Sequence, residues 1–211
     1  MKNYFAKETS RKEFRVTIFG SARMKKSDIC YKQVYSLAKL IGKEDMDIVT
    51  GGGPGLMEAA NKGYKDSKGK GHSIGLVIKL PWENKPNKSV DYYKVYNRFS
   101  KRLDTFMALS NVFVVASGGI GTLLELFYSW QLIQVKHTCK VPIILMGDMW
   151  QGLLKWIKRY PLKNNMISKE DLDIIYYANN AKEAFEIIKS VYDEFKKGGK
   201  NFCLNYKKYK A

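Results

Sequence analysis

Short apolar runs rich in β-branched residues alternate with longer amphipathic stretches along most of the chain. This alternation is typical of βα units, in which parallel strands form a sheet and the intervening helices cover it. The sequence therefore predicts an α/β fold with a mostly parallel central sheet flanked by helices. Predicted strands span residues 14–19, 47–50, 73–78, 91–96, 112–116, 141–146 and 172–176. Predicted helices span residues 27–41, 54–63, 98–109, 123–135, 149–159 and 181–195.

Several residues suggest where these helices begin and end. Ser27 is expected to cap the first helix. Pro54 suits the first turn of the second helix, and Gly63 suits its end. On the helix before the central strand, Phe99 and Phe106 are expected to face the core.

Length and composition predict one folded domain. The chain has 211 residues, of which 45% are hydrophobic and 27% charged, enough for a sizeable core. We expect a basic N-terminal extension over 1–13, the domain over 14–195 and a basic tail over 196–211. No run approaches the roughly 18 apolar residues of a membrane span, and the first residues lack the apolar stretch of a signal peptide. Three scattered cysteines suit a reducing cytosol, so we expect a cytoplasmic protein that does not bind a membrane.

Positive charge predominates. Lys and Arg number 37 against 20 Asp and Glu, a formal net charge of +17, which favours partners that carry phosphate. The tail over 196–211 mixes lysine with aromatic residues, as single-strand binders do. A solvated chain end has the same composition. Nucleic acid is therefore an alternative partner and not the favoured one.

Two glycine-rich turns follow predicted strands, and each opens a helix. Residues 51–55 read G-G-G-P-G, and residues 117–122 read S-G-G-I-G-T. The carboxyl ends of parallel strands share one edge of the sheet, so both turns are expected to face one cleft. Glycine lets the backbone approach a phosphate, and the N–H groups and dipole of a helix N-terminus favour an anion. The turns therefore predict a phosphate site, to which Thr122 would add a hydroxyl.

Several common sites are disfavoured. Neither turn has the spacing G-x-G-x-x-G of a dinucleotide site or G-x-x-x-x-G-K-S/T of an ATP-hydrolysing P-loop. His72 and His137, the only histidines, cannot build a metal cluster. We expect neither a metal nor an organic cofactor.

Glu125 and Arg102 add ionisable groups near the second turn. Glu125 follows Thr122 by three residues, so its carboxylate is expected in the first helical turn, at the mouth of the turn. An ordinary glutamate favoured by the helix dipole has the same position. Arg102, on the helix before the central strand, is compatible with a surface or a cleft position.

Together these residues resemble the LOG (lonely guy) family, long described as possible lysine decarboxylase. The resemblance covers residues 16–145 and is carried by T-G-G-G-P-G-L-M-E-A-A-N-K-G at 50–63, by Arg102 and by G-G-I-G-T-L-L-E at 118–125. It implies a Rossmann-like three-layer fold. It also implies a usually homodimeric hydrolase that cleaves the N-glycosidic bond of a nucleoside 5′-monophosphate. The substrate would be AMP-like or a cytokinin riboside 5′-monophosphate, and the products a free base and ribose 5-phosphate.

The resemblance also assigns roles by position. Arg102 and Glu125 fall on the family's catalytic arginine and glutamate. Positions that bind phosphate or nucleotide fall on Ser21, Gly51, Gly52, Gly53, Glu58, Gly118, Gly119, Gly121 and Thr122. The chain departs from the family pattern at Ser117, where the family has proline, and at Leu103, where it has lysine.

The residue types suit glycosidic cleavage, which passes through an oxocarbenium-like sugar and ends with attack by water. Glu125 could stabilise that sugar or act as the base for water. Arg102 could steady negative charge on the phosphate or on the departing base. Pyridoxal phosphate chemistry would need a Schiff-base lysine with a partner for the pyridinium nitrogen, and we find none, which disfavours a decarboxylase. A non-catalytic protein that binds nucleotides or nucleic acid on the same fold is the alternative.

The helix that follows the second turn bears on the oligomeric state. Residues 123–133 are hydrophobic on more than one face. Such a helix fits a homodimer interface, and it also fits burial within a monomer.

Overall fold

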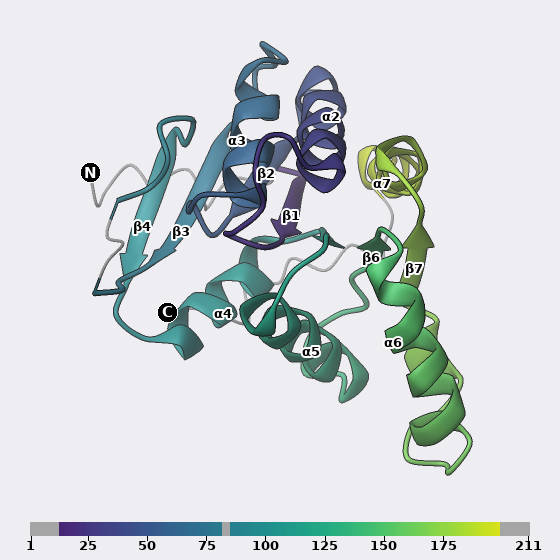
Figure 1. Ribbon diagram of the computed structural model, residues 1–211. Helices are drawn as coiled ribbons and strands as arrows, with labels where there is room; N and C mark the ends of the chain where they lie inside the picture. Colours follow the sequence, from purple (N-terminus) through teal and green to yellow (C-terminus); the bar gives the residue numbers. More distant parts are fainter. Residues whose placement is uncertain (1–12, 82–84, 199–211) are drawn as a thin grey trace.

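A computed structural model describes residues 13–81 and 85–198, and it contains one seven-stranded sheet (Figure 1). The strands are β1 (Arg15–Phe19), β2 (Asp47–Thr50), β3 (Ser73–Ile78), β4 (Tyr92–Tyr96), β5 (Val112–Val115), β6 (Ile143–Met146) and β7 (Ile175–Ala178). Their order across the sheet is β4-β3-β2-β1-β5-β6-β7, and every neighbouring pair is parallel. The predicted α/β fold is confirmed.

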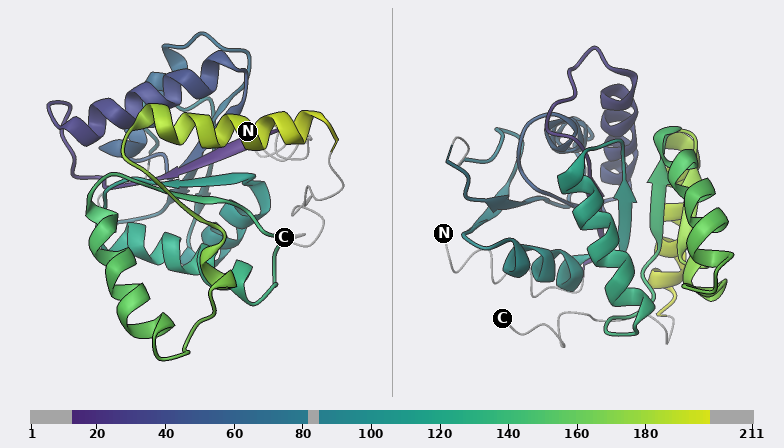
Figure 2. Two further views of the ribbon diagram at one scale, coloured as in Figure 1. Left: turned by 90° about the vertical axis from the view of Figure 1, so that its right-hand side faces the viewer. Right: turned by 60° about the horizontal axis from the view of Figure 1, so that its bottom comes forward.

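Helices cover both faces of this sheet (Figures 1 and 2). They are α2 (Ile29–Lys43), α3 (Leu56–Lys65), α4 (Phe99–Leu109), α5 (Ile120–Gln134), α6 (Met149–Ile157) and α7 (Ala181–Lys196). Helix α6 continues into a π-helical turn, Lys158–Leu162. The core on one face joins the sheet to α2, α3 and α7, and the core on the other joins it to α4, α5 and α6. This is the expected Rossmann-like three-layer arrangement.

Strands β5 and β6 are apolar throughout because they are buried on both faces. Along β5, Val112 and Val114 belong to the core beneath α2, α3 and α7, whereas Phe113 and Val115 belong to the opposite core. Side chains alternate across a strand, so a strand buried on both faces reads as an unbroken apolar run. The same reasoning applies to β6.

The position of the cleft follows from the strand order. From β1 the chain proceeds to β2 and β3 on one side, and from β5 it proceeds to β6 and β7 on the other. Open α/β sheets bind ligands at such a switch point, beyond the carboxyl ends of the strands. Phe19 is in register with Val115, and the Ala116 N–H donates to the Phe19 carbonyl (2.9 Å). The chain therefore leaves β1 and β5 side by side.

Several helix boundaries differ from the predicted ones. Helix α2 begins at Ile29, so Ser27 is not its cap; Asp28 precedes the helix, and its carboxylate accepts a bond from the Lys25 N–H (2.7 Å). Helix α3 begins at Leu56, so Pro54 lies before its first turn. It also continues past Gly63 to Lys65.

Close packing explains the glycine at position 63. A Cβ there would lie 2.1 Å from the Tyr35 carbonyl oxygen on α2. Gly63 thus lets the two helices approach each other and does not end one.

The last strand begins later than predicted. Strand β7 begins three residues after the expected start at 172, because residues 170–172 form a 3₁₀ turn. Residues 1–12 of the predicted extension and all but the first three tail residues lie outside the described residues, and the division into 1–13, 14–195 and 196–211 stays a prediction. No helix in the described ranges is long and apolar enough to cross a membrane.

Candidate active site

A cleft of about 520 Å³ opens at the carboxyl ends of β1, β2, β3 and β5, at the switch point of the sheet. Both glycine-rich turns contribute to it, as the sequence predicts. Its lining residues are Gly20, Ser21, Ala22, Arg23, Gly51, Gly53, Met57, Val77, Ile78, Leu80, Phe99, Arg102, Gly119, Ile120, Gly121, Thr122 and Glu125.

Ser21 joins the two turns through its backbone. Its N–H donates to the Ser117 carbonyl (3.0 Å), and its carbonyl accepts the Leu56 N–H at the start of α3 (2.9 Å). Gly55 has φ +66°, and a Cβ there would lie 2.4 Å from the Ser21 carbonyl oxygen. The chain after β1 therefore holds the first turn at a fixed distance from the second.

The second turn presents the N-terminus of α5 to the cleft. Helix α5 begins at Ile120, three residues earlier than predicted, so Gly121 and Thr122 lie in its first turn. A Cβ on Gly119 or Gly121 would meet no atom within 4 Å, because both face open space. The first N–H groups of a helix have no partner within the helix, and the dipole there favours negative charge. This end of the cleft is thus suited to an anion such as phosphate.

Arg102 and Glu125 form a buried ion pair at the base of the cleft. Arg102 Nη2 on α4 lies 2.7 Å from Glu125 Oε1 on α5, and the two side chains are 9% and 13% exposed. The guanidinium also lies over the Phe106 ring, 5.3 Å from its centroid. Glu125 is in the second turn of α5, one turn deeper than predicted, because the helix begins earlier.

Burial controls the ionisation of Glu125. Removal from water penalises the charged carboxylate and raises its pKa to about 7, while the positive charge of Arg102 opposes the rise. A carboxyl group with this pKa is divided between its two protonation states near neutral pH. It can therefore exchange a proton with a reacting group under ordinary conditions.

The structure brings most predicted site residues together. Ser21, Gly51, Gly53, Arg102, Gly119, Gly121, Thr122 and Glu125 all line the cleft. Gly52 and Gly118 lie behind the lining, and a Cβ on Gly118 would lie 2.1 Å from Thr122 Oγ1. Glu58 is separate, because it lies in the first turn of α3, 3.7 Å from Lys26 Nζ, outside the lining.

The apolar wall of the cleft was not predicted as part of the site. Met57, Val77, Ile78 and Leu80 form it together with Phe99. The expectation that Phe99 faces the core is wrong, because its side chain is 50% exposed at the cleft. Val77 and Ile78 end β3, so the position of the cleft beyond the strands' carboxyl ends was the signal that could have identified them.

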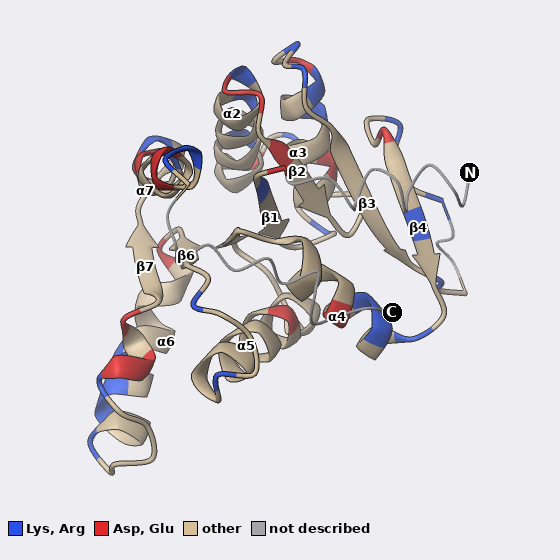
Figure 3. Cartoon of the chain, turned by 180° about the vertical axis from the view of Figure 1, so that it is seen from behind, with Lys and Arg blue, Asp and Glu red and all other residues tan. Residues whose placement is uncertain are grey.

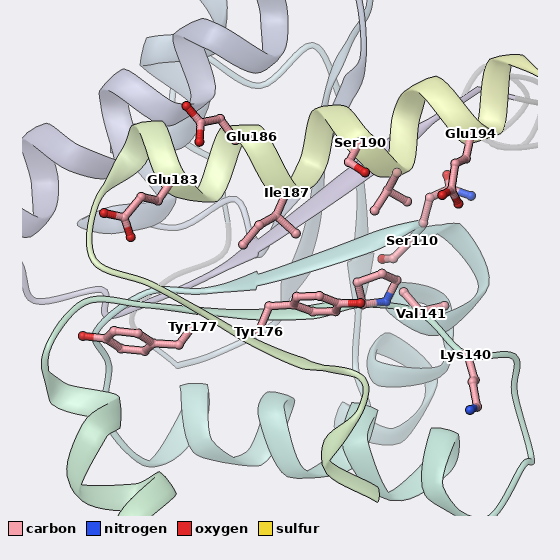
Figure 4. Close-up of a pocket in the computed structure, with 13 residues that line it drawn as sticks. Ser110, Lys140, Val141, Tyr176, Tyr177, Glu183, Glu186, Ile187, Ser190 and Glu194 are labelled. Carbon is pink, nitrogen blue, oxygen red and sulfur yellow. The ribbon is translucent and has the colours of Figure 1, made fainter. Parts of the chain in front are cut away.

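A larger hollow of about 680 Å³ lies between α7 and the amino ends of β5 and β6 (Figure 4). Helix α7 contributes Glu183, Glu186 and Glu194 to it. Carboxylates repel phosphate, and the hollow lies at the amino ends of the strands, whereas open α/β sheets bind ligands beyond the carboxyl ends. It is therefore not a candidate phosphate site. Elsewhere Lys and Arg are spread over helices of both layers, interspersed with acidic residues (Figure 3). Among the described residues, no three His, Cys, Asp or Glu side chains gather as metal ligands.

Comparisons with known proteins identify the family of the chain. Residues 57–188 match the model of the family described as "Possible lysine decarboxylase". The chain is 27% identical over 143 residues to the pyrimidine/purine nucleotide 5′-monophosphate nucleosidase of Escherichia coli K12. That match covers 63% of this chain and 30% of the relative, so the chain spans less than a third of the curated relatives it matches.

Solved structures share the fold. The molybdenum cofactor binding protein of Rippkaea orientalis has a TM-score of 0.65 at 23% identity, covering 87% of this chain and 99% of that one. The molybdenum cofactor carrier protein of Chlamydomonas reinhardtii has a TM-score of 0.66 at 21% identity, covering 86% and 99%. DNA processing protein A of Helicobacter pylori has a TM-score of 0.53 at 15% identity, covering 84% and 81%.

Proposed function

The chain belongs to the possible lysine decarboxylase family, which is the LOG family, and on this premise we propose that it is a nucleoside 5′-monophosphate phosphoribohydrolase. The observation that carries the proposal is the buried Arg102–Glu125 pair beside the N-terminus of α5. An anion site and a carboxyl group of raised pKa thus share one cleft. The name of the E. coli relative supports a nucleotide substrate.

The cleft suggests how the nucleotide would bind. The 5′-phosphate would lie at the N-terminus of α5, at Gly119, Gly121 and Thr122, where helix N–H groups and a hydroxyl can donate. The base would lie along the apolar wall, beside Val77 and Phe99. This arrangement would bring the ribose near Glu125.

Cleavage would proceed at C1′ of the ribose. The bond from C1′ to the base nitrogen breaks, its electron pair leaves with the base, and this nitrogen takes up the proton that the attacking water gives up. The ionised carboxylate of Glu125 stabilises the positive sugar or takes a proton from the water that attacks C1′, and both roles require the ionised form. Arg102 holds Glu125 in place and steadies negative charge on the phosphate or the departing base. The reaction we propose uses no metal and no organic cofactor.

A panel of nucleotides tests this function. Purified protein is incubated with AMP, GMP, CMP, UMP and the isopentenyl form of AMP, and free base and ribose 5-phosphate are separated by chromatography. We expect equal amounts of the two products from at least one nucleotide. Adenosine, which lacks the phosphate, should be cleaved at least about 100-fold more slowly, because the anion site is then unused. Cleavage of adenosine at the rate of AMP would contradict the proposed phosphate site.

One observation favours a second candidate function. Leu103, at the position of the family's lysine, is buried and brings no charge to the cleft. Without that charge the cleft could bind nucleotides or nucleic acid without cleaving them. Nucleotide binding by calorimetry without product release would support this candidate. For nucleic acid, binding should also weaken steeply as salt rises.

We further propose that the protein is a homodimer. Helix α5 exposes Ile120, Leu124 and Phe127 at helical spacing, with exposed fractions of 82%, 44% and 43%. Large apolar side chains exposed together suggest a protein contact. Ile120 also lines the cleft, so a partner chain on this surface would lie at its mouth. The cytoplasmic location stays a prediction.

A further inference from the structure

Asn87 is the centre of a hydrogen-bond network around the first glycine-rich turn. Its Nδ2 lies 3.0 Å from the Gly52 carbonyl oxygen, 3.0 Å from the Gly53 carbonyl oxygen and 2.8 Å from Asn61 Oδ1. Its backbone N–H also donates to the Gly52 carbonyl (2.8 Å). The Ser89 N–H donates to Asn87 Oδ1 (3.1 Å), which fixes the orientation of the carboxamide.

Buried side chains extend this network to α3, β2 and β3. Thr50 and Asn61 are fully buried; Thr50 Oγ1 donates to Asn61 Oδ1 (3.0 Å) and accepts the Gly52 N–H (3.0 Å). Asn61 Nδ2 donates to Ser73 Oγ (2.8 Å). Loss of one member would leave buried polar groups of the others without a partner, which is costly in a protein interior. The network therefore specifies one conformation of the turn.

The turn held in this way forms a wall against Arg102. A Cβ on Gly51 would lie 2.9 Å from Arg102 Nη2 and 2.6 Å from Met57 Sδ. Glu125 Oε1 and the Phe106 ring contact the same guanidinium from other directions. A displacement of Gly51 would thus change the space available to Arg102, while Asn87 itself is not among the residues that line the cleft.

We propose that Asn87 is a positioning residue, which clamps the Gly51–Gly53 turn and thereby keeps Arg102 against Glu125. This inference rests on the proposed function, because it assigns a second layer of residues to that site. It predicts that Asn87 acts on catalysis without touching the nucleotide. A displacement of about 1 Å at a catalytic group lowers rates by about 100-fold.

The test compares two variants with a matched control. Asn87→Ala removes the carboxamide, and Asn87→Asp keeps its size but removes both N–H donors. Asn111→Ala is the control, because Asn111 is also half-buried and its Oδ1 accepts one backbone bond, from Arg15, at the far end of β5. Circular dichroism and thermal unfolding establish that each variant folds.

We expect kcat for the best nucleotide to fall about 100-fold in both Asn87 variants, with KM changed less than about threefold, because the α5 anion site is intact. The acid limb of the pH profile of kcat/KM should also move to higher pH. The reason is that a displaced Arg102 no longer lowers the pKa of Glu125 as it does in the wild type. Asn111→Ala should have the kcat, the KM and the pH profile of the wild type. A wild-type kcat in Asn87→Asp, or a fall in kcat that Asn111→Ala shares, would overturn the proposal.

Amide hydrogen exchange separates this inference from the proposed function. If the wild type cleaves no nucleotide, the hydrolase proposal fails, but the clamp still predicts faster exchange over residues 51–57 in both Asn87 variants. The predicted increase is at least about tenfold, with no change in Asn111→Ala. Unchanged exchange over these residues would show that Asn87 does not hold the turn.

Discussion

Glu125 has a carboxyl group on which burial and a neighbouring arginine act in opposite directions. Burial raises its pKa to about 7, and the charge of Arg102 limits that rise. Spacing along the chain predicted Glu125 near the second turn, but its burial depends on how α4 and α5 pack. For the same reason the sequence left Arg102 between a surface and a cleft position. The burial of Glu125 and the cleft position of Arg102 both result from packing between helices that are distant in the sequence.

The raised pKa predicts a pH dependence. The ionised fraction of Glu125 grows as pH rises through 7, and both proposed roles need the ionised form. We therefore expect kcat/KM to increase about tenfold per pH unit below 7 and to level off above it. This rise, the acid limb of the pH profile, is measured from initial rates between pH 5 and 9 at nucleotide concentrations below and above KM. A fall in kcat/KM over the same rise in pH would mean that Glu125 acts as an acid.

Removal of the Arg102 charge should shift that limb. In Arg102→Gln, burial of Glu125 is no longer opposed, so its pKa rises and the limb moves to higher pH. At pH 7 we expect kcat/KM at least about 100-fold below that of the wild type. Arg98→Gln, at an exposed position just before α4, serves as the control and should leave the profile unchanged. An Arg102→Gln profile with its limb at the wild-type pH would contradict the coupling of the two residues.

At the scale of elements, the two glycines before α5 have different roles. A Cβ at Gly118 would lie 2.1 Å from Thr122 Oγ1, whereas one at Gly119 would extend into open cleft. We expect Gly118→Ala to lower the midpoint of thermal unfolding by several degrees, through a packing cost of about 1–3 kcal/mol. Gly119→Ala should unfold like the wild type, but with KM raised about tenfold because its methyl group occupies phosphate space.

The control for both is Gly152→Ala on α6, where a Cβ also meets nothing within 4 Å but lies outside the cleft. It should leave KM unchanged. A normal KM in Gly119→Ala would place the phosphate elsewhere.

Element order was predictable from the sequence, but several boundaries were not. Predominantly apolar runs identified the five inner strands, because a covered parallel sheet buries its strands on both faces. The edge strands β4 and β7 were also predicted, although they are partly exposed and their sequence pattern is weaker. Gly63 was misleading because glycine also permits close helix packing, which no local pattern distinguishes from a helix end. Asn87 and Asn61 form their network only after the chain has folded, since 26 positions separate them. Motif spacing could therefore predict the cleft but not its supporting layer.

At the scale of the whole molecule, the exposed face of α5 suggests that the chain does not act alone. We expect light scattering to give about twice the mass of one chain. Phe127→Lys, which places a charge on that face, should yield monomers. Val95→Lys is the control, because Val95 is similarly exposed but lies on β4, at the edge of the sheet, and should leave the mass unchanged. A wild-type mass of one chain at micromolar concentration would contradict the dimer.

The central claim is that the Arg102–Glu125 pair cleaves a nucleotide held at the N-terminus of α5. The most direct test compares the wild type with Glu125→Gln on the same nucleotide, with product release followed by chromatography and affinity by calorimetry. We predict that the wild type releases base and ribose 5-phosphate in equal amounts. Glu125→Gln should bind the nucleotide within about threefold of that affinity and release at least about 1,000-fold less product. Equal release by the two proteins, or nucleotide binding by the wild type without any release, would contradict the account.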